Sequence, residues 1–377
     1  MFSNSGGIPI ATGVFFQKSK GATMDDLVIS PSAMLPADGV RPSQFFGGGT
    51  FGKLVGAFRR LDAWAMRREV LVCTDCATFD DRAALALLAL SPRWRLVGVV
   101  STTVPEKTIE PENKSLSPIV LDDDRVSQCL ASLPLKKQPH VVPGAQALST
   151  NADTPDNEAA DFIIATAAAH GQRNRLLVVV LGAATDVAIA LGKDAELEDK
   201  IEVVAAAFDN WPNGGDHNKA SHDVAAWQMI MDSSVSVTIA SGQTAADSLS
   251  MSPRDALTRL RGKARKQVGQ KLFSWLKSEQ TINEKNDEPQ TLTGLLAVAH
   301  AFGYTQTTLY RRPTLKDDCN FLHGGSTEPL PCQTCIGEPR IRWIVGVEEK
   351  RFWGELVSTI SSYGTEPDSA SGSENDR

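Results

Sequence analysis

The sequence predicts an α/β protein with a mostly parallel central sheet and helices on both of its faces. From residue 69 onward, short apolar runs alternate with runs rich in Ala and Leu, as strands alternate with helices in such folds. Two of the runs, "RLLVVVLG" and "KIEVVAAAF", are apolar at consecutive positions, which is typical of strands covered on both faces. A chain of 377 residues is long enough to bury the core that such a sheet needs.

The expected strands are short runs of mainly Val, Ile and Leu residues. The first of them, "REVLVCTD", has its apolar centre at Val70, Leu71 and Val72. In chain order, the expected strands cover 69–74, 94–104, 140–145, 175–182, 200–208, 236–241 and 340–347.

The expected helices lie between these strands. The first covers 80–90 and has strong helix formers in every turn. The others cover 125–133, 157–171, 183–194, 223–233, 291–303 and 350–361. The polar segment 104–124 is predicted to be a loop.

The two ends of the chain differ in composition from this alternating region. Residues 1–68 are interpreted as an N-terminal extension, partly flexible, in which the Gly-rich stretch "FFGGGTFG" precedes an amphipathic helix. Residues 69–365 are expected to form the α/β domain. The tail, 366–377, is acidic and rich in Ser, so we expect it to be disordered.

Composition narrows the functional classes. A net charge of −7 argues against a nucleic-acid-binding surface, which needs a basic field. No apolar stretch approaches the 18 residues that a membrane span requires. Six cysteines in this length do not suggest a disulfide scaffold, so a reducing, cytoplasmic location is expected. The first acidic residue is Asp25, which keeps an organelle-targeting peptide open as an alternative.

Three carboxylates lie where the first strand turns into the first helix. The segment "CTDCATFDDRAALALLAL" contains Asp75, Asp80 and Asp81, at the strand end where open α/β sheets bind ligands. Helix capping explains one acid at a helix N-terminus, because free N–H groups attract negative charge there. It does not explain all three, because clustered carboxylates repel one another unless a cation or a shared proton relieves them. A capping role and a ligand site both remain open at this point.

Four segments carry a family resemblance. They are "CTDCATFDD", "LGAATD", "GGDHNKASHDVAAW" and "IRWIVGVEEKRFW". Their order and spacing resemble the inosine/uridine-type nucleoside hydrolases, which are α/β enzymes that cleave the N-glycosidic bond of ribonucleosides with a bound calcium ion. The matching family motifs are Asp-x-Asp-x-x-x-Asp-Asp, Gly-Pro-Leu-Thr-Asn, a Glu-x-Asn loop before an Asp-Pro-x-Ala-Ala helix, and a final strand with an Arg-Phe-Trp helix. The resemblance spans nearly everything from 69 to 363.

The resemblance implies a calcium site. It places Asp75 at the calcium-bound aspartate that also activates the attacking water, Asp81 at the second carboxylate ligand, and Leu181 at the backbone carbonyl ligand. Calcium takes six to eight oxygen ligands, including several carboxylates, and would relieve the crowding of negative charge. A water bound to it would lose a proton more readily.

The resemblance also implies a sugar site. Asp80 matches the position that holds the ribose hydroxyls, and Asp216 and Asn218 match the Glu and Asn that grip the sugar. His217 lies between them, so we also assign it to substrate binding. Together with His222, it is a candidate for protonating the leaving base.

The sequence departs from the family pattern at several of these positions. Cys73 replaces the first Asp of the motif, and the loop between Asp75 and Asp80 is one residue longer. Thr293 and Gly294 replace a late His-Asp pair that supplies the last calcium carboxylate and an acid near the leaving base. Two hypotheses therefore stand. One is a divergent calcium-dependent nucleoside N-ribohydrolase of purine or pyrimidine salvage, as a possible homo-oligomer. The other is a non-catalytic relative that acts as a ligand-binding module or assembly subunit.

One further group of residues has the composition of a metal site. Cys319, His323, Cys332 and Cys335 include a Cys-x-x-Cys pair and are a candidate for structural zinc. The spacing from Cys319 to His323 is not a common zinc pair, and a reduced loop without a metal is the alternative.

Overall fold

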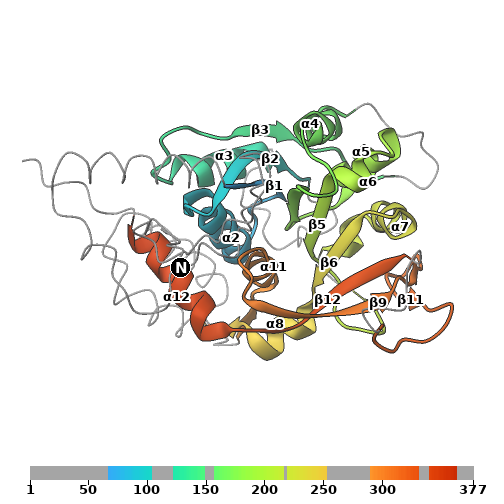
Figure 1. Ribbon diagram of the computed structural model, residues 1–377. Helices are drawn as coiled ribbons and strands as arrows, with labels where there is room; N and C mark the ends of the chain where they lie inside the picture. The colour runs from blue at the N-terminus through green and yellow to red at the C-terminus, as the bar shows by residue number, and fades with distance from the viewer. Residues whose placement is uncertain are drawn as a thin grey trace, which may run out of the picture. The chain divides into compact units, whose positions relative to one another are not determined.

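The computed structural model describes residues 67–103, 122–148, 157–215, 219–252, 289–330 and 339–362. They belong to one compact unit, Trp64–Arg377, and form an eight-stranded sheet (Figure 1). Nearly all of the expected extension 1–68 and the whole tail 366–377 lie outside the described residues.

The sheet has the strand order β3-β2-β1-β4-β5-β6-β12-β9. Every neighbouring pair is parallel except β12 and β9, which are antiparallel. The strands are β1 (Arg68–Thr74), β2 (Trp94–Ser101), β3 (His140–Pro143), β4 (Leu176–Val180), β5 (Ile201–Ala206), β6 (Ser236–Ala240), β9 (Thr305–Arg311) and β12 (Arg340–Val347). Two small antiparallel pairs complete the strands of the described residues: β7 (Ser250–Met251) with β8 (Gln290–Thr291), and β10 (Thr314–Leu315) with β11 (Phe321–Leu322).

Helices cover both faces of the sheet, and Figure 1 shows them on its two sides. One face carries α2 (Phe79–Leu90), α3 (Asp122–Ala131), α8 (Gly242–Ser248), α11 (Thr293–Ala301) and α12 (Glu349–Ser362). The other carries α4 (Glu158–Ala167), α5 (Thr185–Lys193), α6 (Leu197–Lys200) and α7 (Val224–Asp232), and a short 3₁₀ turn, η6 (Ala220–His222), precedes α7. Each face of the sheet thus has its own hydrophobic core. Central strands are apolar at consecutive positions because successive side chains point alternately into one core and the other. In β1, Val70 and Val72 pack in the first core, whereas Leu71 and Cys73 pack in the second.

The chain order of the strands reverses direction between β1 and β4. The chain builds outward from β1 through β2 to β3, and then returns to place β4 on the other side of β1. Crossover connections therefore leave β1 and β4 in opposite directions, which opens a crevice at their carboxyl ends. Asp75 directly follows β1 and Leu181 directly follows β4, so two expected site residues border this crevice.

The predicted fold class and the alternation of strands with helices are confirmed. Differences lie at the ends of elements and at the sheet edge. Helix α3 begins at Asp122, three residues earlier than expected. The sequence reasoning did not anticipate α8 or the edge strand β9, whose burial alternates irregularly along its length. None of the described helices is long and apolar enough to cross a membrane.

His300 of α11 is a half-buried titratable group on the side of the sheet that carries α2 and α11. Its Nδ1 lies 2.7 Å from Thr305 Oγ1. Burial, and then the positive charges of Arg342 on β12 and Arg68 on β1, lower the pKa of His300 to about 4. The imidazole is therefore neutral in the folded protein at neutral pH.

This pKa predicts how stability depends on pH. The unfolded chain binds a proton at His300 near pH 6.5, whereas the folded protein does so only near pH 4. The stabilisation is thus complete above pH 6.5 and is lost as the pH falls toward 4, by about 1–3 kcal/mol. We expect His300→Gln, measured by urea unfolding across this range, to flatten that part of the profile. The exposed His140→Gln is the control, and an equal flattening by both variants would contradict the prediction.

Candidate active site

The aspartates at the start of α2 serve the helix and the crevice at once. Thr78 is the N-cap: its Oγ1 accepts a hydrogen bond from the Asp81 backbone N–H at 3.3 Å and donates to Asp81 Oδ2 at 2.9 Å. Asp81 Oδ2 also accepts a bond from the Thr78 N–H, which completes a capping box. The capping interpretation of the cluster therefore holds for Asp81. The capping bonds use only Oδ2 of Asp81, which leaves Oδ1 available to a second partner.

That partner is Lys219. Its Nζ lies 2.6 Å from Asp81 Oδ1 and 2.7 Å from the Leu181 carbonyl oxygen. The Asp81 side chain is 2% exposed and that of Lys219 is 19% exposed, so the ion pair joins a buried carboxylate to a partly buried ammonium. Two of the oxygens that the resemblance assigns to calcium thus meet at one ammonium group.

The Leu181 carbonyl is positioned by the end of β4. Leu181 and Gly182 both donate their N–H groups to the Cys73 carbonyl, which extends the ladder between β4 and β1 past its last paired residues. Gly182 is required here because a Cβ would lie 2.1 Å from Thr102 Oγ1 and 3.4 Å from the Asp75 nitrogen. This close approach brings the ends of β1, β2 and β4 together at the crevice.

Asp75 lies in the turn between β1 and α2 and is 6% exposed. Its Oδ1 accepts a hydrogen bond from the Ala77 N–H at 2.9 Å, and Thr74 Oγ1 accepts one from the Cys76 N–H at 3.1 Å. The extra residue of this loop is accommodated by Cys76, which adopts a positive φ of 50°. The turn therefore holds the Asp75 carboxylate at the strand end through short-range hydrogen bonds.

Asp80 is held by a different helix. Its Oδ2 accepts the Gly294 N–H at 2.5 Å and its Oδ1 accepts the Leu295 N–H at 2.8 Å, both at the N-terminus of α11. The free N–H groups of a helix N-terminus favour an anion. The helix start that should carry the family's last calcium carboxylate thus binds a carboxylate from α2 instead.

The charges of the site influence one another. Burial is the main reason that the pKa of Asp80 is raised to about 6; Lys219 and the two N–H groups of α11 act to lower it, and the charge of Asp81 acts to raise it. Burial lowers the pKa of Lys219, but the carboxylates of Asp81, Asp80 and Asp75 outweigh this effect and hold the pKa above its ordinary value. Lys219 is therefore a permanent cation inside an acidic cluster.

Comparison with protein-family profiles identifies the family of this chain. The profile of the inosine-uridine preferring nucleoside hydrolases matches residues 70–354, which is most of the chain. The chain belongs to this nucleoside hydrolase family. A search of curated proteins found no match.

Solved structures of nucleoside hydrolases have the same fold. A plant nucleoside hydrolase is 14% identical, with a TM-score of 0.57 over 78% of this chain and 99% of that one. A purine-preferring ribonucleoside hydrolase from Gardnerella vaginalis is 19% identical, with a TM-score of 0.56 over 79% of this chain and 99% of that one. An inosine-uridine preferring nucleoside hydrolase from Bacillus anthracis is 12% identical, with a TM-score of 0.56 over 78% and 99% of the two chains.

The oxygens that the described residues place at this site do not fit the calcium ion that is typical of nucleoside hydrolases. Asp81 Oδ1 and the Leu181 carbonyl already contact an ammonium, and Gly294 provides no side chain where the resemblance predicts the last carboxylate. Within the described residues, no group of three or more His, Cys, Asp or Glu side chains is arranged to hold a metal. A divalent cation would need Lys219 to leave and more oxygens to arrive.

The segment that carries Lys219 is anchored just after it by Asp223. Asp223 Oδ2 accepts hydrogen bonds from Thr185 Oγ1 at 2.6 Å and from the Leu148 N–H at 2.8 Å, and its Oδ1 accepts the Ala226 N–H at 2.9 Å as the N-cap of α7. Asp223 is 3% exposed, so all three bonds are shielded from water. This anchor joins the start of α5 and the start of α7, and fixes where the segment re-enters the core.

The loop before Lys219 is tied to the segment that follows β10. Gly215 donates its N–H to the Cys319 carbonyl, Phe321 donates to the Asn213 carbonyl, and His323 Nε2 lies 2.6 Å from the Pro212 carbonyl. Asp216, His217 and Asn218, the expected sugar-binding residues, lie outside the described residues, between Gly215 and Lys219. Their roles stay predictions.

The structural-zinc hypothesis finds no support. Cys319 is 4% exposed within the core that α7 and β11 line, and the His323 ring packs against Trp211 and Phe321. Both residues thus have a packing role that explains their presence. Cys332 and Cys335 lie outside the described residues.

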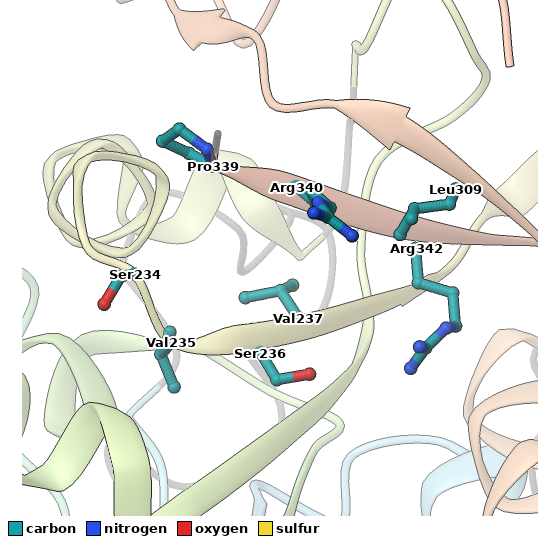
Figure 2. A pocket seen from close by; sticks show the side chains of 8 residues that line it. All are labelled: Ser234, Val235, Ser236, Val237, Leu309, Pro339, Arg340 and Arg342. Carbon is teal, nitrogen blue, oxygen red and sulfur yellow. The ribbon is translucent and has the colours of Figure 1, made fainter. Parts of the chain in front are cut away.

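A separate hollow of about 380 Å³ lies at the amino ends of the strands, away from the crevice. Figure 2 shows its lining side chains around the amino ends of β6 and β12, with Arg340 and Arg342 among them. Its described lining offers no carboxylate, and open α/β sheets bind ligands at the carboxyl ends of their strands. We therefore place the candidate active site at the carboxyl ends of β1 and β4.

Lys219 is the residue that sequence reasoning missed. It directly follows Asn218 in a segment singled out for the sugar, but no family motif assigns a lysine there. The signal that was present is electrostatic. Gly294 supplies no carboxylate where the resemblance predicts one, and three aspartates remain. A lysine next to a predicted site residue is then a candidate for the balancing positive charge.

Gly294 gives a direct test of the contact between Asp80 and α11. A Cβ at this position would lie 3.0 Å from Asp80 Oδ2, so Gly294→Asp places a second carboxylate beside a buried one. We expect it to be less stable than Gly294→Asn by about 1–3 kcal/mol at neutral pH, because only the aspartate adds charge. Urea unfolding measures the difference, and equal stability of the two variants would contradict it.

Proposed function

We propose that this protein hydrolyses the N-glycosidic bond of ribonucleosides in the crevice between the ends of β1 and β4. Membership of the nucleoside hydrolase family supports the reaction class. The single observation that carries the location is the meeting of Asp81 and the Leu181 carbonyl at one cationic centre beside the Asp75 turn, at the point where the strand order reverses.

Asp75 is the proposed general base. In this reaction a water oxygen bonds to the anomeric carbon while the bond from that carbon to the base nitrogen breaks. Asp75 takes a proton from the water, so that ribose and the free base result. Two features favour this role. The Ala77 N–H fixes the orientation of the Asp75 carboxylate, and because the side chain is buried, little solvent competes for it.

Sugar recognition is proposed for Asp80 together with Asp216, His217 and Asn218. Asp80 has two oxygens that each accept one backbone N–H from α11, and a carboxylate oxygen has lone pairs for a second donor such as a ribose hydroxyl. As the sugar gains oxocarbenium character, a nearby carboxylate stabilises the growing positive charge.

Departure of the base has less help than in a complete site. Thr293 is not an acid at neutral pH, and Gly294 has no side chain. The leaving base therefore takes its proton from His217, His222 or solvent. A missing general acid lowers a rate by about 100- to 10,000-fold, so we expect slow turnover.

The calcium requirement predicted from the resemblance is not part of this proposal, because the donor set does not fit the ion. Substrates are proposed to be free ribonucleosides rather than nucleic acid, in keeping with the net charge of −7. A cytoplasmic location and a homo-oligomeric state remain proposals from the sequence.

The test is release of free ribose from inosine, uridine and adenosine by the full chain. We expect slow release, and Asp75→Asn to reduce it by at least about 100-fold because the amide cannot accept the proton. The matched control is Asp232→Asn, which removes an exposed carboxylate at the end of α7 and should leave the rate unchanged.

Two results would count against hydrolysis. If the rate does not change in Asp75→Asn, the activity belongs to a contaminant or to another base. If no ribose is released while ribose binds by calorimetry, the protein is a ligand-binding relative of the nucleoside hydrolases.

A further inference from the structure

The expected calcium site and the observed lysine site use the same oxygens. Calcium was expected at Asp75, Asp81 and the Leu181 carbonyl, and the Lys219 Nζ contacts the last two at 2.6 Å and 2.7 Å. An ammonium donates hydrogen bonds to carboxylate and carbonyl oxygens at these distances, so no other ion is needed to satisfy them.

The surrounding charges match a monovalent cation better than a divalent one. Where the resemblance predicts a third calcium carboxylate, Gly294 supplies only its backbone N–H. That N–H, with the one from Leu295, already neutralises part of the charge on Asp80. The cluster has therefore lost negative charge and gained donors, which are the two changes that suit a lysine.

The chain around Lys219 holds the ammonium in this place. The residue directly precedes η6, and the Asp223 anchor follows within four positions. Lys219 is separated from Asp81 by 138 positions in the sequence, and the carboxylate that it meets is itself fixed by the capping box of α2. Both partners are thus held by structure that does not depend on their pairing, which lowers the entropy cost of the contact.

We propose that the ε-ammonium of Lys219 takes the place of the divalent cation in this nucleoside hydrolase, so that the carboxylate cluster is assembled without a metal. Lys219 is then a positioning residue: it holds Asp81 and the Leu181 carbonyl in place and balances the charge beside Asp75. Its role in hydrolysis rests on the proposed function, whereas its role as the resident cation does not.

The first experiment uses the full chain, stripped with a chelator, and calcium chloride as the probe. We expect no heat of binding in calorimetry and the same unfolding temperature in calcium and in chelator, because Lys219 already satisfies the site. Stoichiometric calcium binding that raises the unfolding temperature would overturn the proposal, because the lysine would then yield its place to the metal.

The second experiment removes the charge. Lys219→Met keeps an apolar stem of similar length, and we expect the unfolding temperature in chelator to fall by roughly 10 °C, as for a buried ion pair that loses one partner. The matched control is Lys200→Met. Lys200 Nζ also pairs with a carboxylate, Glu196, at 2.9 Å and its side chain is 22% exposed, but it lies on α6.

An unfolding temperature that falls no further in Lys219→Met than in Lys200→Met would overturn the proposal. If Lys219→Met does not fold, Lys219→Gln replaces it, because the amide still donates a hydrogen bond but carries no charge. Calorimetry on the unchanged chain decides the metal question independently of either variant.

Ribose release in chelator separates this inference from the proposed function. Release that persists in chelator supports both. Release that appears only with calcium supports hydrolysis and overturns the lysine cation. If no release occurs under either condition, hydrolysis fails, and the calorimetry and unfolding results still decide the role of Lys219.

Discussion

The crowding of negative charge at the end of β1 is the constraint on which the rest of the site depends. Asp75, Asp80 and Asp81 are all buried, and buried carboxylates cannot stay ionised together without compensation. The structure compensates locally. Asp81 pairs with Lys219, and Asp80 binds the N-terminus of α11. Each solution draws in a distant part of the chain, so α2, α11 and the segment before α7 converge around this cluster.

These contacts link the chemistry to the architecture. The strand order reverses between β1 and β4, which opens the crevice, and Gly182 lets the strand ends approach closely enough for the Leu181 carbonyl to join Asp81 at one cation. Asp223 fixes the segment from the opposite face of the sheet. Stability and site geometry are therefore not separate properties here, because the bonds that satisfy buried carboxylates also set their orientation.

A metal and a lysine are different solutions to the same charge problem. Calcium brings two positive charges and exchangeable coordination, so it binds water and substrate as well as protein. An ammonium brings one charge and three donors in a compact group, and it remains covalently attached. The proposed substitution removes dependence on metal supply and also removes an electrophile from the crevice, which is a second reason to expect slow hydrolysis.

The sequence by itself determined the fold class, most of the order of strands and helices along the chain, and the family, because periodicity and motif order are local properties that survive at low identity. It also placed Asp75 and Leu181 at or just after strand ends and Asp81 at the start of the following helix. It did not reveal the partners of those residues. Asp81 lies 138 positions from Lys219, and Asp80 lies 214 positions from Gly294, so only the folded chain decides that they meet. Pairing between buried charges is a property of three-dimensional proximity and desolvation, which no spacing in the sequence encodes.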